Sequence, residues 1–337
     1  MLNEEFIFLG ILFVPVLLLS FIISLSLFPK WIKKSRSLGL VWEDMHKKNT
    51  PKNVAGSGGI CVLIGFIISV FLYIGIRTFI FNNPSKSTEI FALTITVILA
   101  GGVGLIDDLF GWKKGGLSKR SRIALLFLIA IPLMVINAGT SIISGINLGI
   151  FYPLVVVPLA IVAVTSTFNF LAGFNGLEAS QGMILLSAIS LVNFIVGNWW
   201  LALIGMSFVS ALLAFWFFNK YPAKVFPGDI LTYSTGALIA SLVILGNIEK
   251  IAAFFFIPYI IEMFLKLRGK LKIQSFGKLQ EDGSLDLRQK GIYGLEHVAI
   301  VLLKKLKPSK KAYEWEVPLV INIFQLLLIV LGFILFL

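Results

Sequence analysis

Ten long apolar runs determine what this chain can fold into. A helix that crosses the hydrocarbon core of a bilayer needs about 20 apolar residues. We place the spans at 6–28, 58–80, 89–106, 122–138, 150–168, 177–197, 200–218, 229–246, 250–267 and 317–337. Because 58% of the 337 residues are hydrophobic and only 14% are charged, a water-soluble protein is excluded. We predict an all-α polytopic membrane protein with about ten transmembrane helices and a single domain, 1–337.

The distribution of basic residues predicts the orientation of these spans. An even number of spans puts both termini on one side, and loops that stay in the cytoplasm retain Lys and Arg. The loops after the first, third, seventh and ninth spans hold 26 of the 29 basic residues, and the longest of them, 266–316, holds 12. We therefore expect both termini outside and these loops in the cytoplasm. Their charge would attract membrane lipids or an anionic substrate, and no nucleic-acid partner is expected.

A polar stretch between the fifth and sixth spans is the strongest sign of a functional site. Residues 169–179 read Asn-Phe-Leu-Ala-Gly-Phe-Asn-Gly-Leu-Glu-Ala. Unpaired polar groups are costly in hydrocarbon, so such a cluster at a helix end usually faces a bundle interior, a metal or a ligand. Hydrogen bonding between helices is the simpler alternative for this segment taken alone.

Two carboxylate clusters are predicted on the same membrane face. Asp107 and Asp108 end the third span, where mutual repulsion and the helix dipole favour a compensating cation such as Mg²⁺, although a solvated Asp pair is the alternative. Asp229 follows Pro227-Gly228 at the start of the eighth span, where an N-cap is the alternative role. Together the three clusters predict one oxygen-rich pocket at the cytoplasmic face. This composition suits Mg²⁺-assisted phosphoryl transfer better than hydrolysis by a nucleophilic Ser or Cys.

Three other segments carry weaker signals. The Gly-rich end of the first loop, within 49–59, could present N–H groups to phosphate, but a flexible return into the second span is the preferred interpretation. Pro258 should kink the ninth span. Residues 295–307 have the apolar spacing of a surface helix, in which we expect His297 to be a boundary residue rather than a catalyst.

Taken together, these motifs resemble the polyprenyl-phosphate N-acetylhexosamine-1-phosphate transferases, a family of the glycosyltransferase family 4 type, over nearly the whole chain. Asp107-Asp108 matches the Asp-Asp motif of the family, and 116–118 matches the basic stretch that follows it. Residues 169–176 match the Asn-rich loop, and 226–229 match the Gly-Asp motif. The stretch 169–179 looks most like the dolichyl-phosphate branch of archaea and eukaryotes.

The resemblance implies the reaction of UDP-GlcNAc with dolichyl phosphate to give dolichyl-diphospho-GlcNAc and UMP, the first step of lipid-linked oligosaccharide assembly for protein N-glycosylation. It also implies ten helices, a cytosolic Mg²⁺ site with Mn²⁺ as an alternative ion, a place in the cell membrane, and compatibility with a homodimer. The implied site residues are Asn169 and Asp229 as metal ligands, Gly173, Asn175 and Phe226 around the uracil, Asp107 or Asp108 ordering the attack of the dolichyl phosphate, and Arg122 at the diphosphate.

The last loop departs from this branch. Eukaryotic members have an Arg-His-Arg-x-Pro-Arg stretch there, whereas this chain offers Arg268, Lys270 and Lys272. We predict that Lys272, with one of the other two, acts as the diphosphate clamp. The His-rich motif of the bacterial translocases is missing, which argues against a muramyl-pentapeptide substrate. Another UDP-N-acetylhexosamine for surface polysaccharide is the alternative substrate, and a membrane transporter is the alternative class of protein.

Overall fold

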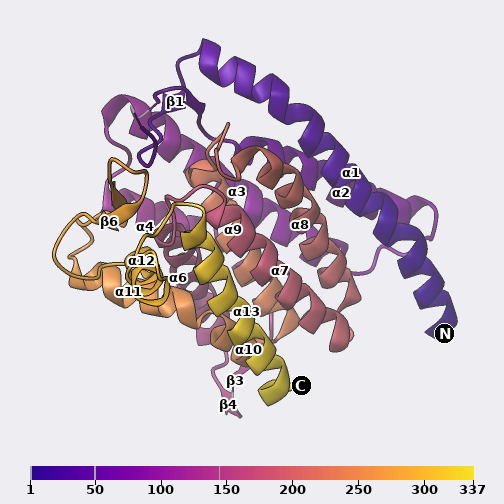
Figure 1. Ribbon diagram of the computed structural model, residues 1–337. Helices are drawn as coiled ribbons and strands as arrows, with labels where there is room; N and C mark the ends of the chain where they lie inside the picture. Colours follow the sequence, from indigo (N-terminus) through magenta and orange to yellow (C-terminus); the bar gives the residue numbers. More distant parts are fainter. Residues whose placement is uncertain (1, 49–50, 144) are drawn as a thin grey trace.

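Long helices make up most of the protein, which a computed structural model describes over residues 2–48, 51–143 and 145–337. Within these residues, eight helices are long and apolar enough to cross a membrane (Figure 1). They are α1 (Leu2–Ser37), α2 (Gly59–Phe79), α3 (Ser87–Lys114), α6 (Val157–Phe170, after a π-helical turn Tyr152–Val156), α7 (Leu177–Ile195), α8 (Trp199–Asn219), α9 (Gly228–Gly246) and α13 (Glu316–Phe336). The prediction of an all-α polytopic membrane protein is confirmed.

The other two predicted spans are each divided into two shorter helices. The first gives α4 (Lys119–Leu128) and α5 (Ile131–Val135), and the second gives α10 (Glu249–Phe255) and α11 (Ile257–Arg268). Pro132 and Pro258 each lie in the first turn of the second helix of the pair. A proline ring has no N–H and clashes with the carbonyl four residues earlier, so it is tolerated only in a first turn. The expected break at Pro258 is confirmed.

Helix α9 lies at the centre of the bundle and is the most buried of the spanning helices. Glycines let its neighbours approach closely. A Cβ on Gly104 of α3 would lie 2.4 Å from the Asp229 carbonyl oxygen, and one on Gly236 of α9 would lie 2.6 Å from Thr165 Cα of α6. Small residues at such crossings are the usual means of close packing between membrane helices. The inner ends of α3, α6 and α9 are thereby brought together.

Short ribbons and one amphipathic helix form the connections. The ribbons are β1 (Val41–Trp42) with β2 (Val54–Ala55), β3 (Ile142–Ile143) with β4 (Ile146–Asn147), and β5 (Gly277–Leu279) with β6 (Leu285–Leu287). The predicted surface helix is present as α12 (Leu295–Leu306), and His297 within it is buried. Figure 1 shows β1 at the upper left, β6 below it at the left edge, and β3, β4 and the C-terminus at the bottom.

The outer surface of α13 is apolar along its whole length. The exposed side chains recur at helical spacing and are Leu319, Ile323, Leu327, Val330 and Ile334. A continuous apolar stripe that no other element covers is expected where a helix faces lipid.

Candidate active site

One cavity of about 940 Å³ opens where the loops after α1, α3, α6, α8 and α11 meet. Its lining includes eight of the nine residues predicted for the site: Asp107, Asp108, Arg122, Asn169, Gly173, Asn175, Phe226 and Asp229. The ninth, Lys272, is exposed and is not among the lining residues; its loop contributes Gln274 and Phe276 instead. The clamp role of Lys272 stays a prediction.

Asp107, Asp108 and Asp229 form one side of this cavity, which we call the carboxylate wall. Asp108 joins two helices, because its Oδ1 accepts a hydrogen bond from the Asp229 backbone N–H at 2.7 Å. Its Oδ2 accepts one from the Ser57 hydroxyl at 2.8 Å. Gly228 has φ +71°, and a Cβ there would lie 2.2 Å from Asp108 Oδ2. Only glycine therefore allows this close approach.

Arg122 compensates the charge of the carboxylate wall. Its guanidinium pairs with both oxygens of the buried Asp107, and Nη2 lies 3.0 Å from Oδ1 and 3.9 Å from Asp229 Oδ2. Asp107 also accepts hydrogen bonds from the Leu117 N–H at 2.8 Å and from the Tyr233 hydroxyl at 3.3 Å. Asp107 is thus held by several donors, so it is not the solvated carboxylate of the alternative interpretation.

Asn169 and Asp229 offer oxygen atoms to the cavity. The Asn169 Oδ1 accepts a hydrogen bond from Thr232 Oγ1 at 2.9 Å, and an amide oxygen has capacity for a second partner. Asp229 is not the N-cap of α9, since Pro227 holds that position and Asp229 is the second residue of the helix. Amide and carboxylate oxygens fit a hard cation such as Mg²⁺. In the described part of the chain, no group of three or more His, Cys, Asp or Glu side chains could hold a metal. An ion here would need phosphate oxygens or water to complete its shell.

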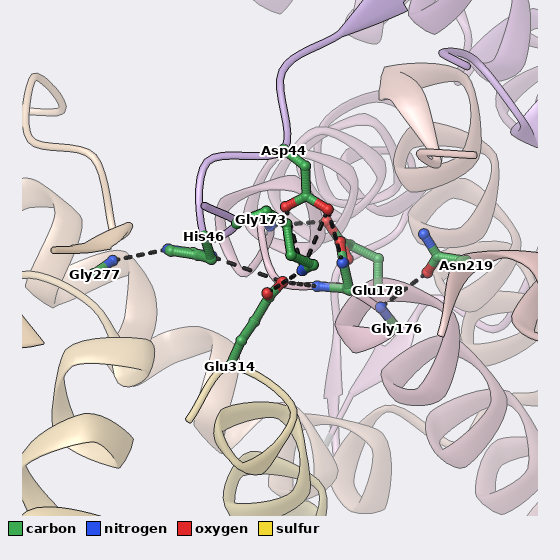
Figure 2. Close-up of polar contacts among 10 residues, drawn as sticks. Asp44, His46, Gly173, Gly176, Glu178, Asn219, Gly277 and Glu314 are labelled. Atoms are coloured by element: carbon green, nitrogen blue, oxygen red, sulfur yellow. Dashed lines mark hydrogen bonds and ion pairs between the residues drawn. The ribbon is translucent and has the colours of Figure 1, made fainter. Parts of the chain in front are cut away.

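A second part of the lining, which we call the loop wall, consists of Asp44, Gly173 and Asn175, together with Glu314, which accepts a hydrogen bond from the Asn175 N–H but does not itself line the cavity. The loop between α6 and α7 is held in shape by two side chains: Glu178 accepts a hydrogen bond from the Gly173 N–H at 2.8 Å, and Asn219 accepts one from the Gly176 N–H at 3.1 Å. Asp44 and Glu314 reach this loop from the first and last loops (Figure 2). Three segments far apart in sequence therefore meet here.

The Gly-rich end of the first loop is part of the site. Ala55, Gly58 and Gly59 exchange backbone hydrogen bonds with residues 224–227, and Ser57 reaches Asp108 as described above. The expectation of a merely flexible return into the second span is wrong, because these bonds fix the segment against the start of α9. Asn49 and Thr50, at the beginning of that stretch, lie outside the described residues.

Sequence reasoning missed several polar residues that line the cavity. Asp44, Asn219 and Thr232 are among them. Thr232 lies three residues after Asp229, so it shares a helix face with it, and this spacing could have identified it. Asp44 lies in an irregular loop, where no periodicity points to a site.

Comparison with known proteins shows which family has this sequence pattern. Residues 90–247 match the model of glycosyl transferase family 4. A protein of Saccharolobus solfataricus, with the provisional description UDP-N-acetylglucosamine–dolichyl-phosphate N-acetylglucosaminephosphotransferase, is 34% identical over 84% of this chain and 86% of its own length. The chain belongs to glycosyl transferase family 4.

Relatives from other organisms are also similar to the chain. A UDP-N-acetylglucosamine–dolichyl-phosphate N-acetylglucosaminephosphotransferase of Dictyostelium discoideum is 28% identical over 71% of this chain and 68% of its own length. A phospho-N-acetylmuramoyl-pentapeptide-transferase of Wolbachia pipientis is 28% identical over 75% of this chain and 80% of its own length. The family match at 90–247 contains the whole carboxylate wall, whereas Asp44 and Glu314 of the loop wall lie outside it.

Proposed function

We propose that this protein transfers GlcNAc-1-phosphate from UDP-GlcNAc to dolichyl phosphate, giving dolichyl-diphospho-GlcNAc and UMP. The observation that carries the proposal is that the carboxylate wall and a polar loop line the same cavity, with Arg122 beside the carboxylates. Two relatives described by this activity, one of them provisionally, match most of the chain. The product would begin lipid-linked oligosaccharide assembly for N-glycosylation.

The chemistry needs a positioned pair of phosphates more than a strong base. An oxygen of the dolichyl phosphate attacks the β-phosphorus of UDP-GlcNAc, the bond from that phosphorus to the bridging oxygen breaks, and UMP leaves. The attacking phosphate is already anionic, so positioning and charge stabilisation carry most of the catalysis. Arg122 is placed to stabilise diphosphate charge, and Asp107 fixes the direction of its guanidinium.

Asn169 and Asp229 would hold Mg²⁺, or Mn²⁺ in its place, because both present oxygen atoms to the cavity. A bound divalent cation would neutralise charge on the diphosphate as the leaving UMP departs. Asp108 would position Asp229, because it accepts a hydrogen bond from the Asp229 N–H and so fixes the start of α9.

The decisive experiment is incubation of the purified protein with dolichyl phosphate, Mg²⁺ and radiolabelled UDP-GlcNAc, followed by separation of UMP from the lipid product. We expect equal amounts of UMP and lipid-linked GlcNAc, and loss of both when a chelator removes the cation. Other UDP-N-acetylhexosamines in parallel reactions would test the choice of sugar. Release of free GlcNAc-phosphate without lipid product would contradict the transfer.

We propose that the cavity lies on the cytoplasmic side of the cell membrane, because four of the five loops that line it belong to the set that holds most of the basic residues. The buried Cys61 is the only cysteine, so a Cys61→Ser background allows a single new thiol to be labelled. We expect Glu281→Cys, at an exposed position in the last loop, to react with an impermeant reagent only in inside-out vesicles. Reaction in intact cells would contradict this orientation.

A further inference from the structure

A charged cluster fixes the orientation of the Asn175 side chain at the loop wall. The Asn175 Nδ2 donates a hydrogen bond to Asp44 Oδ2 at 3.2 Å, and its backbone N–H donates one to Glu314 Oε1 at 3.4 Å. Figure 2 shows Asp44 and Glu314 on opposite sides of the loop that carries Gly173 and Gly176. The Asn175 side chain is buried at the boundary of the cavity.

The partner of Asp44 makes it an acceptor. The Lys47 ammonium lies 3.3 Å from Asp44 Oδ2 and also pairs with Glu314. A carboxylate in such an ion pair has only acceptor atoms, so the Asn175 amide must turn its NH₂ group toward it. Rotating the amide by half a turn would set two oxygens against each other in a buried place. The Asp44 carboxylate thus determines where the oxygen and the nitrogen of the Asn175 amide lie.

His46 of the first loop and Glu314 of the last loop support this arrangement. His46 Nε2 accepts a hydrogen bond from the Gly277 N–H at 3.1 Å, so the ring proton is on Nδ1, 3.8 Å from Glu314 Oε1. Burial raises the pKa of Glu314, but the contacts with His46 and Lys47 outweigh burial and leave the pKa below its ordinary value. Glu314 is therefore a carboxylate that holds Lys47 in place.

The Asn175 amide presents its acceptor and its remaining donor to the cavity in one fixed order. One hydrogen of Nδ2 is used by Asp44, and Asn175 lines the cavity, where its Oδ1 can meet a ligand. The amide can thus offer an acceptor and a neighbouring donor to a ligand. Uracil has the complementary edge, an N3–H next to a carbonyl. Cytosine has the reverse, an unprotonated ring nitrogen next to an amino group.

We propose that Asp44 makes the site specific for uracil over cytosine nucleotides, by holding the Asn175 amide in the one orientation that accepts from N3–H. This inference rests on the proposed function, since it takes the base of the UDP-sugar to lie at Asn175. Asp44 is a positioning residue here, because it acts on the base through Asn175.

The test is the ratio of dissociation constants for CMP and UMP, measured by calorimetry on the purified full-length protein. An unsatisfied buried pair costs about 1–3 kcal/mol, so we expect wild type to favour UMP by roughly ten- to a hundredfold. In Asp44→Asn the new amide can accept or donate, so Asn175 can turn to suit either base. We expect the ratio to fall to about threefold or less, mainly through tighter binding of CMP. A ratio unchanged in Asp44→Asn would overturn the proposal.

Two controls keep the result interpretable. Glu43→Gln removes the neighbouring carboxylate, which pairs with Lys52 at 2.7 Å, and should keep the wild-type ratio. UMP methylated at N3 lacks the donor and should bind wild type as weakly as CMP; equal binding of methylated and normal UMP would overturn the proposal even if Asp44→Asn did not fold. Transfer from UDP-GlcNAc with an unchanged ratio would overturn this inference alone. Absence of both transfer and UMP binding in wild type would overturn the proposed function with it.

Discussion

The two walls of the cavity are built in different ways. The carboxylate wall is carried by α3 and α9, which touch through glycine, and one of its carboxylates is bonded to the backbone of the other helix. The loop wall joins three segments distant in sequence through side-chain ion pairs. Rigid elements hold reacting groups more accurately than loops do, whereas loops can change to suit a new ligand. We therefore expect changes in the carboxylate wall to lower turnover and changes in the loop wall to alter substrate choice.

The largest effect should come from Asp229→Asn in the carboxylate wall. If Asp229 holds the cation at the diphosphate, losing its charge removes several kcal/mol of stabilisation, so turnover should fall on the order of a thousandfold. UMP release from radiolabelled UDP-GlcNAc measures the effect. The fold should persist, since the side chain does not cap α9. Turnover close to wild type in a monodisperse variant would remove Asp229 from the catalytic groups.

A matched pair of glycine substitutions compares the walls directly. Gly228 and Gly173 both have positive φ, +71° and +112°, so alanine is strained at either one. The added Cβ at 228 would lie 2.2 Å from Asp108 Oδ2, whereas at 173 it would meet the ring of Phe276, 2.8 Å away, which can turn aside. We expect Gly228→Ala to lower kcat by roughly a hundredfold through displaced catalytic groups. Gly173→Ala should mainly raise KM for the UDP-sugar.

The same comparison explains what could be predicted from the sequence. Carboxylates at apolar helix ends, such as Asp107 and Asp229, are conspicuous because hydrocarbon makes them costly, and the turn before Asp229 marks a helix start. The sequence predicts that the ends of α3 and α9 meet, but not that Gly104 makes the close contact, since its role depends on which helix it faces. Asp44 belongs to an irregular loop, and its partner Asn175 is 131 residues away. Positions in such loops follow from tertiary contacts that no local pattern encodes.

Arg122 and Lys272 compete for the role of diphosphate clamp. Arg122 lines the cavity within reach of the carboxylate wall, whereas Lys272 is exposed outside it. A charge-assisted contact is worth about 1.5–3 kcal/mol, so Arg122→Lys, which loses the bidentate fork but keeps the charge, should lower kcat/KM by roughly ten- to a hundredfold. Lys272→Ala should change it by less than about threefold for UDP-GlcNAc. A larger loss in Lys272→Ala would show that the last loop closes over the diphosphate in the bound state.

The smallest effect concerns Glu296, a buried carboxyl in the last loop. The same loop supplies Glu314 to the loop wall. Glu296 of α12 is fully buried. Burial, and secondly the charge of Glu262, raises the pKa of Glu296 well above its ordinary value. A carboxyl whose pKa is raised on folding contributes stability that is present below the unfolded pKa and is lost as pH rises through the folded one.

Glu296→Gln tests this dependence, because the amide keeps the shape and cannot ionise. Near pH 4.5 the two proteins should unfold at similar temperatures. As pH rises toward 8, Glu296 of the unfolded wild type loses its proton, whereas the folded protein holds it, and this difference lowers the stability of wild type. The variant has no such loss, so its midpoint of thermal unfolding in detergent should become higher than that of wild type by about 3 °C. UMP affinity should not change, since Glu296 does not line the cavity. A difference in midpoint that is the same at every pH would mean that folding does not raise the pKa of Glu296.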